Sequence, residues 1–140
     1  MTFQYQKTNS YFAQVANGLE EMAATEIENL GATKVNQRFR GLQFTADAEA
    51  IYRINYGSRL LTRILAPLIS FDCHSTKYLY KTAMGIPWEE LFAPDQTFAI
   101  FSQVSNSAIT HSQYASLKLK DAIVDRFREK LRRRPNVESK

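Results

Sequence analysis

A chain of 140 residues, 44% of them hydrophobic, has enough apolar side chains for one ordinary domain or two small ones, which excludes a disordered tail. Its net charge of +4 weakly favours an anionic partner, and its one cysteine, Cys73, excludes an internal disulfide and favours a reducing compartment. No apolar run is long enough to cross a bilayer and no secretion signal is present, so a cytoplasmic protein without a membrane partner is expected.

The start of the chain predicts a strand followed by a helix. Residues 10–16 alternate apolar side chains with small or polar ones, as a partly buried strand does. Asn17 is the candidate cap of a helix that begins at Leu19, because its side-chain oxygen can accept an unpaired backbone N–H. Apolar residues then recur at helical spacing, and Gly31 lies where a left-handed residue commonly ends a helix.

A hairpin is expected next. Residues 34–39 and 42–45 have strand character, and Arg40 and Gly41 between them suit a tight turn. The two strands should therefore pair directly with each other.

A second helix and an edge strand complete this part. The helix is expected from about Asp47 to Leu61. The apolar run 64–71 contains Pro67, which has no N–H for a central ladder, so it predicts a strand at the edge of a sheet. The order β-α-β-β-α-β is the ferredoxin-like arrangement, an antiparallel sheet with two helices on one face, and it indicates an α+β fold.

A new unit is expected to begin near Cys73. Ser75 or Thr76 can cap a helix that runs through Met84, and residues 97–104 alternate as a strand does. One strand is too few, because a sheet usually needs three or more strands for independent stability. The remaining strands of this unit are therefore expected to lie beyond this chain.

The last thirty residues, 111–140, hold nine of the eighteen basic residues but only four of the fourteen acids. Their apolar residues predict an amphipathic helix capped by His111 or Ser112. Pro135 stops this helix, so the helix is expected to end in the arginines at 132–134, where its dipole favours positive charge. The apolar arc comprises Leu117, Leu119, Ile123, Val124, Phe127 and Leu131.

Lys120 breaks this pattern, because it falls within the apolar arc and must snorkel, pair with an acid or face something other than core. Two interpretations of the helix remain open. It is either a solvated helix with ordinary ion pairs, or a face that binds phosphates through arginine contacts and counterion release. The spacing does not distinguish RNA from DNA or from an acidic protein.

No catalytic constellation is found. The glycines are never closer than ten residues apart, so the chain has no glycine-rich loop for a nucleotide cofactor. Cys73 and His74 are adjacent, a spacing that seldom lets both bind one metal, and packing or surface roles are favoured over a metal site or a nucleophile. Asp121 and Asp125 lie one helical turn apart, but neighbouring cations favour a salt-bridged surface over paired catalytic carboxylates.

Tyr114 is the best candidate for stacking on a nucleic-acid base. It lies on the polar side of the last helix with Lys118 one turn away, and exposed aromatic rings beside cations can stack on unpaired bases. Packing between helices is the alternative role of this ring.

Three stretches resemble the N-terminal region of bacterial 23S rRNA guanine-N2 methyltransferases: YFAQVANGLEEMAATEIENLGA, AIYRINYGSRLLTRIL and HSQYASLKLKDAIVDRFREKLRRRPNV. In that family a ferredoxin-like domain precedes a THUMP domain and then a Rossmann-type methyltransferase domain that uses S-adenosylmethionine. The resemblance implies a ferredoxin-like domain at 1–72 and a partial THUMP domain at 73–140. It implies no cofactor in this chain and S-adenosylmethionine in the missing catalytic domain.

The THUMP resemblance implies that this part binds structured RNA, with 23S rRNA as the expected partner. With Tyr114 added from the helix pattern, the expected RNA-binding residues are Gln113, Tyr114, Lys118, Lys120, Arg132, Arg133 and Arg134.

Other functions remain open. They are the RNA-binding part of another RNA- or DNA-modifying enzyme, such as one for tRNA thiolation or pseudouridine formation, and a basic protein-interaction module. If strands are missing, the final helix and residues 97–104 are expected to leave apolar surface and an unpaired edge, through which the chain could self-associate.

Overall fold

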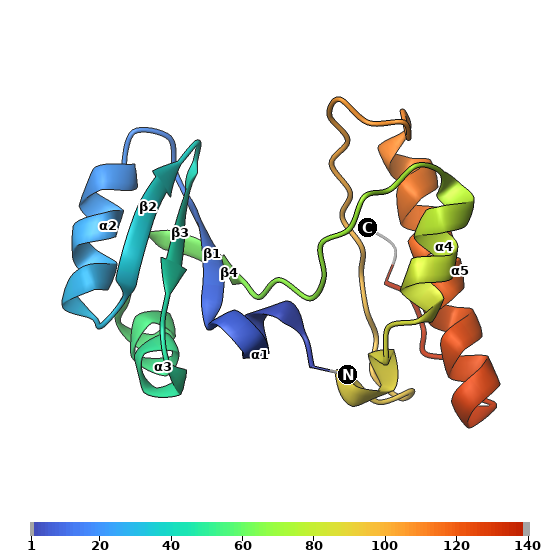
Figure 1. Ribbon diagram of the computed structural model, residues 1–140. Coiled ribbons are helices and arrows are strands. Elements are labelled where there is room, and N and C mark those ends of the chain that lie inside the picture. The colour runs from blue at the N-terminus through green and yellow to red at the C-terminus, as the bar shows by residue number, and fades with distance from the viewer. Residues whose placement is uncertain (1, 139–140) are drawn as a thin grey trace. The chain divides into compact units, whose positions relative to one another are not determined.

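The computed structural model describes residues 2–138, which form two compact units, residues 2–70 and residues 71–138. Each unit has its own set of helices (Figure 1). None of the helices described is long and apolar enough to span a lipid bilayer.

The first unit is a four-stranded antiparallel sheet with helices. The strand order is β2-β3-β1-β4, and all three pairings are antiparallel. This confirms the predicted α+β, ferredoxin-like arrangement, to which a short N-terminal helix is added (Figure 1). In chain order the elements are α1 (Gln4–Thr8), β1 (Ser10–Val15), α2 (Glu20–Asn29), β2 (Thr33–Arg38), β3 (Gly41–Thr45), α3 (Ala48–Gly57) and β4 (Leu61–Leu65).

Helices α2 and α3 cover one face of this sheet. Successive strand residues point to opposite faces, so Ala13 and Val15 of β1 share a face with Leu42 and Phe44 of β3. These four residues are buried in one cluster with apolar residues of both helices, including Ile27 and Ile54. The core therefore lies on one side of the sheet only.

The end of α3 differs from the prediction. The carboxylate of Glu26 accepts hydrogen bonds from Ser58 Oγ (2.5 Å) and Arg59 N (3.1 Å), which holds the chain in a turn. Burial favours a higher pKa for Glu26, but these hydrogen bonds outweigh it and lower the pKa. The helix consequently ends at Gly57. The prediction that it runs to Leu61 is wrong because Glu26, far away in the sequence, hydrogen-bonds to the residues that follow Gly57.

Two further local predictions are corrected. The fourth strand is Leu61–Leu65 rather than 64–71, and Pro67 follows it, although the strand does lie at the sheet edge as predicted. The N-cap of α2 is Leu19 with no side-chain hydrogen bond, so Asn17 is not the cap. The Glu20 carboxylate instead accepts the backbone N–H of Gly18 at 2.8 Å.

The second unit is built on two packed helices. Its elements are α4 (Thr76–Met84), the 3₁₀ turn η1 (Trp88–Glu90) and α5 (Ser112–Leu131). Ser75 caps α4 as predicted, because its Oγ accepts the N–H of Tyr78 at 3.2 Å. Trp88 and Phe127 are buried, and the ring of Phe92 lies 4.9 Å from that of Phe127.

Residues 97–104 are extended but do not form the predicted strand within the described part of the chain. They make one isolated parallel bridge, Phe98 with Val137, in which Phe98 N donates to Asn136 O (3.3 Å) and Glu138 N donates to Phe98 O (2.9 Å). Burial still alternates along the segment between exposed and half-buried residues. The prediction was wrong because a ladder needs a neighbouring strand. Self-association through this segment stays a prediction.

The end of α5 also differs from the prediction. The helix ends at Leu131, and Arg132 adopts a left-handed conformation with φ of 53°. The three arginines therefore follow the helix instead of forming its last turn, and Pro135 is buried in the segment that returns to Phe98. The buried arc is shorter than predicted, since Leu117 and Leu131 are 48% and 44% exposed.

Candidate nucleic-acid interface

A groove between α4 and α5 brings cations and aromatic rings together. We call it the α4–α5 groove. It lies beside the N-terminal half of α5 and has a volume of about 340 Å³. Its lining residues are Thr76, Lys77, Tyr80, Tyr114 and Lys118.

Tyr114 and Lys118 act as one pair within this groove. They lie one turn apart on α5, and Lys118 Nζ is 5.6 Å from the centre of the Tyr114 ring, a cation–π distance. Tyr114 is 47% exposed, so part of its ring is accessible from solvent. The pair can offer an anion a positive charge and a base an aromatic surface.

Tyr80 lines the same groove and is held in place by a hydrogen bond. Its hydroxyl donates a hydrogen bond of 2.6 Å to Asp125 Oδ2. This hydrogen bond, together with partial burial and nearby carboxylates, raises the pKa of Tyr80 to about 12. Tyr80 is therefore a neutral donor at physiological pH and links α4 to α5.

A second hollow lies toward the C-terminal end of α5, with a volume of about 470 Å³. Lys120 Nζ is 2.8 Å from Asp121 Oδ1, so of the three options for this lysine it forms an ion pair. Arg128 Nη1 is 3.4 Å from Asp125 Oδ1. The hollow therefore contains charges of both signs. Its net positive charge is smaller than its lysine and arginines alone would give, so it attracts an anion less strongly. Its lining residues are Lys120, Asp121, Val124, Asp125, Arg128, Arg134, Asn136 and Val137.

The structure does not gather the seven predicted residues in one place. Lys118 and Arg132 are separated by roughly 20 Å along the helix axis, given a rise of 1.5 Å per residue. Gln113 lines another hollow, which it shares with Tyr114 but not with Lys118. Only Tyr114 and Lys118 share the α4–α5 groove, and only Lys120 and Arg134 share the C-terminal hollow.

The arginines at 132–134 are exposed. Among the described residues, no carboxylate lies within ion-pair distance of them. Their charges are therefore not neutralised within that part of the chain, which leaves the cluster accessible to a polyanion.

The sequence pattern did not identify Lys77 as a candidate RNA-binding residue. It is exposed and lines the α4–α5 groove opposite Lys118. Helical periodicity placed it on α4, but the spacing within one helix does not say which second helix its side chain will face. Only the packing of α4 against α5 brings the two lysines to one groove.

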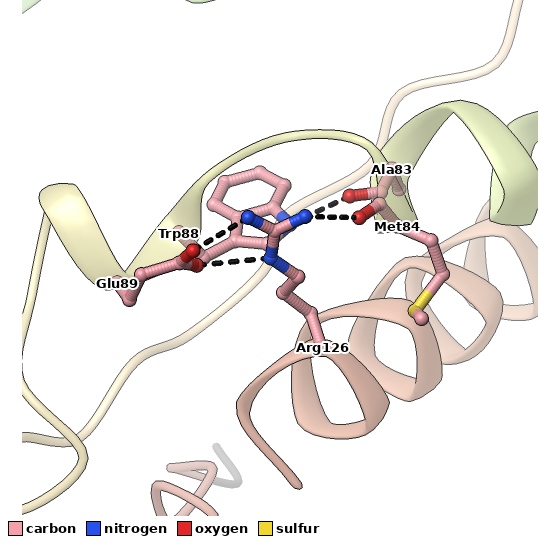
Figure 2. Close-up of polar contacts among 5 residues, drawn as sticks. All are labelled: Ala83, Met84, Trp88, Glu89 and Arg126. Atoms are coloured by element: carbon pink, nitrogen blue, oxygen red, sulfur yellow. Dashed lines mark hydrogen bonds and ion pairs between the residues drawn. The ribbon is translucent and has the colours of Figure 1, made fainter. Parts of the chain in front are cut away.

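Arg126 links α5 to the C-terminal end of α4 and to the turn η1. Figure 2 shows its guanidinium forked onto the Glu89 carboxylate, with Nε to Oε2 at 3.0 Å and Nη2 to Oε1 at 2.5 Å. Nη1 also donates to Met84 O at 3.1 Å, and Trp88 Nε1 donates to Ala83 O at 2.8 Å. The hydrogen bonds from Arg126 lower the pKa of Glu89. These contacts fix α5 against the end of α4 and the turn η1.

Cys73 and His74, which were weighed as metal ligands, do not line the grooves described above. Cys73 Sγ donates to Ser75 O at 3.5 Å, and the His74 ring lies 5.8 Å from the ring of Tyr78. The described residues contain no group of three or more side chains that could hold a metal ion.

The fold is that of an α+β protein with two compact units, and known family models match most of each unit. Residues 10–65 match the RlmL ferredoxin-like domain, and residues 73–140 match the THUMP domain. The chain therefore matches a ferredoxin-like domain of the RlmL type followed by a THUMP domain, and the resemblance noted from the sequence is confirmed.

Its relatives are RNA methyltransferases by name. The chain is 40% identical over 131 residues to a Synechocystis sp. protein described as a candidate RNA methyltransferase, covering 94% of this chain and 34% of the relative. It is 38% identical over 128 residues to the ribosomal RNA large subunit methyltransferase K/L of Syntrophotalea carbinolica, covering 91% of this chain and 18% of the relative. The chain thus spans about a third or less of these relatives.

Solved structures share the fold. A crystal structure of a candidate methyltransferase with bound SAH matches 97% of this chain and 36% of its own, with a TM-score of 0.77 and 20% identity. A Listeria monocytogenes protein described as a candidate N6-adenine-specific DNA methylase matches 93% of this chain and 34% of its own, with a TM-score of 0.67 and 25% identity.

Proposed function

We propose that this chain is the RNA-binding and substrate-targeting part of a ribosomal RNA methyltransferase. The THUMP domain and the names of the relatives support RNA as the ligand. In the proposed protein, a segment outside this chain transfers a methyl group from S-adenosylmethionine to the N2 of a guanine in 23S rRNA. The described residues of this chain do not fit that cofactor, because no glycine-rich loop follows any of the strands β1 to β4.

The α4–α5 groove is the observation that carries this proposal. Lys77 and Lys118 reach it from two different helices, with the Tyr114 ring beside Lys118. Two separated charges and one ring suit a bent or single-stranded segment, in which phosphates and an unpaired base are accessible together. The exposed arginines after α5 add a second phosphate-binding element.

The test is RNA affinity measured as a function of salt concentration. Each phosphate contact contributes about 0.7 to 0.9 to the slope of log K against log salt. The double variant Lys77→Gln/Lys118→Gln should reduce the magnitude of this slope by roughly 1 to 2, and alanine at all three of Arg132, Arg133 and Arg134 should reduce it by up to roughly 2 to 3.

The matched control is Lys81→Gln/Lys130→Gln, which removes one charge from each helix outside the groove. It should change the slope less than the groove variant does. A groove variant with the wild-type slope would exclude Lys77 and Lys118 from phosphate contacts.

A DNA-modifying enzyme is the second candidate, because one structural relative is described as a DNA methylase. Single-stranded DNA of the same sequence as the RNA, used as a competitor in the same titrations, separates the two. RNA-specific binding favours the RNA enzyme, and equal competition by DNA favours the alternative.

A further inference from the structure

Within residues 2–70, the sheet has a face on which neither α2 nor α3 packs. Helices α2 and α3 pack on the opposite face, which carries Ala13, Val15, Leu42 and Phe44. The strand register places eight residues of this open face in two rows that cross all four strands. The first row is Leu65, Phe12, Gln43 and Asn36, and the second is Arg63, Gln14, Gly41 and Arg38.

The aromatic ring of Phe12 lies over the middle of this open face. A Cβ built on Gly41 would be 2.2 Å from Phe12 Cζ and 2.7 Å from Phe12 Cε1, so the ring occupies the space above a glycine of the adjacent strand. Phe12 remains half-buried although it belongs to a central strand. A ring held in this way, on a four-stranded antiparallel sheet, is the kind of surface on which unpaired bases stack.

The side chains around the ring are polar or basic. Gln14 and Gln43 are exposed on either side of Phe12, and Arg38 Nη2 donates to Gln43 Oε1 at 3.3 Å. Arg63 and Arg38 mark the two ends of the second row, three strand spacings or about 14 Å apart.

Charge is segregated between the two sides of this unit. The four strands contain no acidic residue. Every acid of residues 2–70 lies instead in α2, in α3 or at the cap of α3: Glu20, Glu21, Glu26, Glu28, Asp47 and Glu49. The open face therefore carries positive charge without neighbouring carboxylates on its own strands, which favours a polyanion over a basic or apolar protein surface.

We propose that this open face binds a single-stranded segment of RNA, with a base stacked on Phe12 and phosphates held by Arg38 and Arg63. Gln14 and Gln43 can donate to and accept from base edges beside the ring. The choice of RNA over DNA rests on the proposed function. The site itself is separate from the α4–α5 groove and lies in the other unit.

The test compares two RNA probes with the intact chain. One is a blunt hairpin, and the other is the same hairpin with a short unpaired extension that contains 2-aminopurine. Phe12→Leu keeps an apolar cover over Gly41 but removes the ring, and it should weaken binding of the extended hairpin by roughly 5- to 50-fold with loss of the stacking-induced quenching. Arg38→Gln/Arg63→Gln should weaken it by a similar factor, and Phe12→Tyr should restore binding.

Binding of the blunt hairpin should be unchanged in these variants. Lys77→Gln/Lys118→Gln is the reference for the α4–α5 groove. If the sheet variants lose the extension while the groove variant binds both probes normally, the open-face proposal stands and the groove assignment fails. Wild-type affinity of the Phe12 and arginine variants for the extended hairpin would overturn the proposal and leave this face to a protein partner. No binding of either probe by the wild type would overturn both.

Discussion

The two units are stabilised in different ways. In residues 2–70, backbone ladders join four strands and an apolar cluster fills one side of the sheet. In residues 71–138, two helices pack on each other, and side-chain hydrogen bonds from Arg126 and Tyr80 cross between elements. The first unit depends mainly on its ladders and apolar cluster, with the Glu26 carboxylate holding one turn, whereas the described part of the second has one isolated bridge and depends more on polar pairs between elements.

This difference matters for binding. The groove residues Lys77 and Lys118 belong to separate helices, so their spacing depends on how α4 packs on α5. The two rows of the open face are spaced by the backbone register itself. A perturbation of side chains between helices should therefore affect the groove more than the sheet.

The largest expected effects come from removing one buried ring in each unit. Phe44 and Phe127 are 1% and 0% exposed, and truncation to alanine should cost about 3–5 kcal/mol in either case. Hydrogen exchange should show protection lost in the sheet for Phe44→Ala and in α4 and α5 for Phe127→Ala. Tyr56→Ala, at a residue 96% exposed, is the control and should change stability by less than about 0.5 kcal/mol. Equal loss of protection in both units for either core variant would show that they unfold as one.

A smaller effect is expected from the Arg126 fork. Arg126→Met leaves the Glu89 carboxylate, with a side chain only 23% exposed, without its partner and should destabilise the second unit by about 2 kcal/mol. The double variant Glu89→Gln/Arg126→Met should recover part of this loss.

The same pair predicts a pH dependence. The pKa of Glu89 is lowered in the folded chain by the hydrogen bonds from Arg126. The stabilisation of the folded chain by ionised Glu89 is therefore complete above the unfolded pKa of 4.5. It is lost as the pH falls through the lower pKa that Glu89 has in the folded chain. The free energy of unfolding, measured with urea across this pH range, should fall less steeply with decreasing pH in Arg126→Met than in the wild type. An identical dependence on pH in both proteins would argue against the assignment.

The smallest effect is expected for Tyr80→Phe, which removes one hydrogen bond to Asp125 and should cost about 1 kcal/mol. The folded pKa of Tyr80 is raised from 10.0 to about 12. The stabilisation is thus present below pH 10 and is lost as pH rises toward 12. The difference in unfolding free energy between wild type and Tyr80→Phe should shrink over that interval, and a constant difference would contradict this role.

Local pattern predicted most of the elements and failed where a distant group intervenes. The hairpin, the cap at Ser75 and the order of the first unit follow from short-range signals. The end of α3 does not, because Glu26 lies more than thirty residues before the turn that it holds. Residues 97–104 have the alternation of a strand, but pairing needs a neighbour that their own sequence cannot supply.

The sequence by itself determined the class of fold and the location of the basic residues, because hydrophobic periodicity and charge are properties of neighbouring residues. It also placed Tyr114 beside Lys118, since they are one turn apart on a helix. Only the tertiary structure decided that Lys77 joins them, that Lys120 is paired with Asp121, and that Phe12 lies over Gly41. Those relations depend on helix packing, side-chain geometry and strand register, which bring together or orient groups in ways that chain order leaves open.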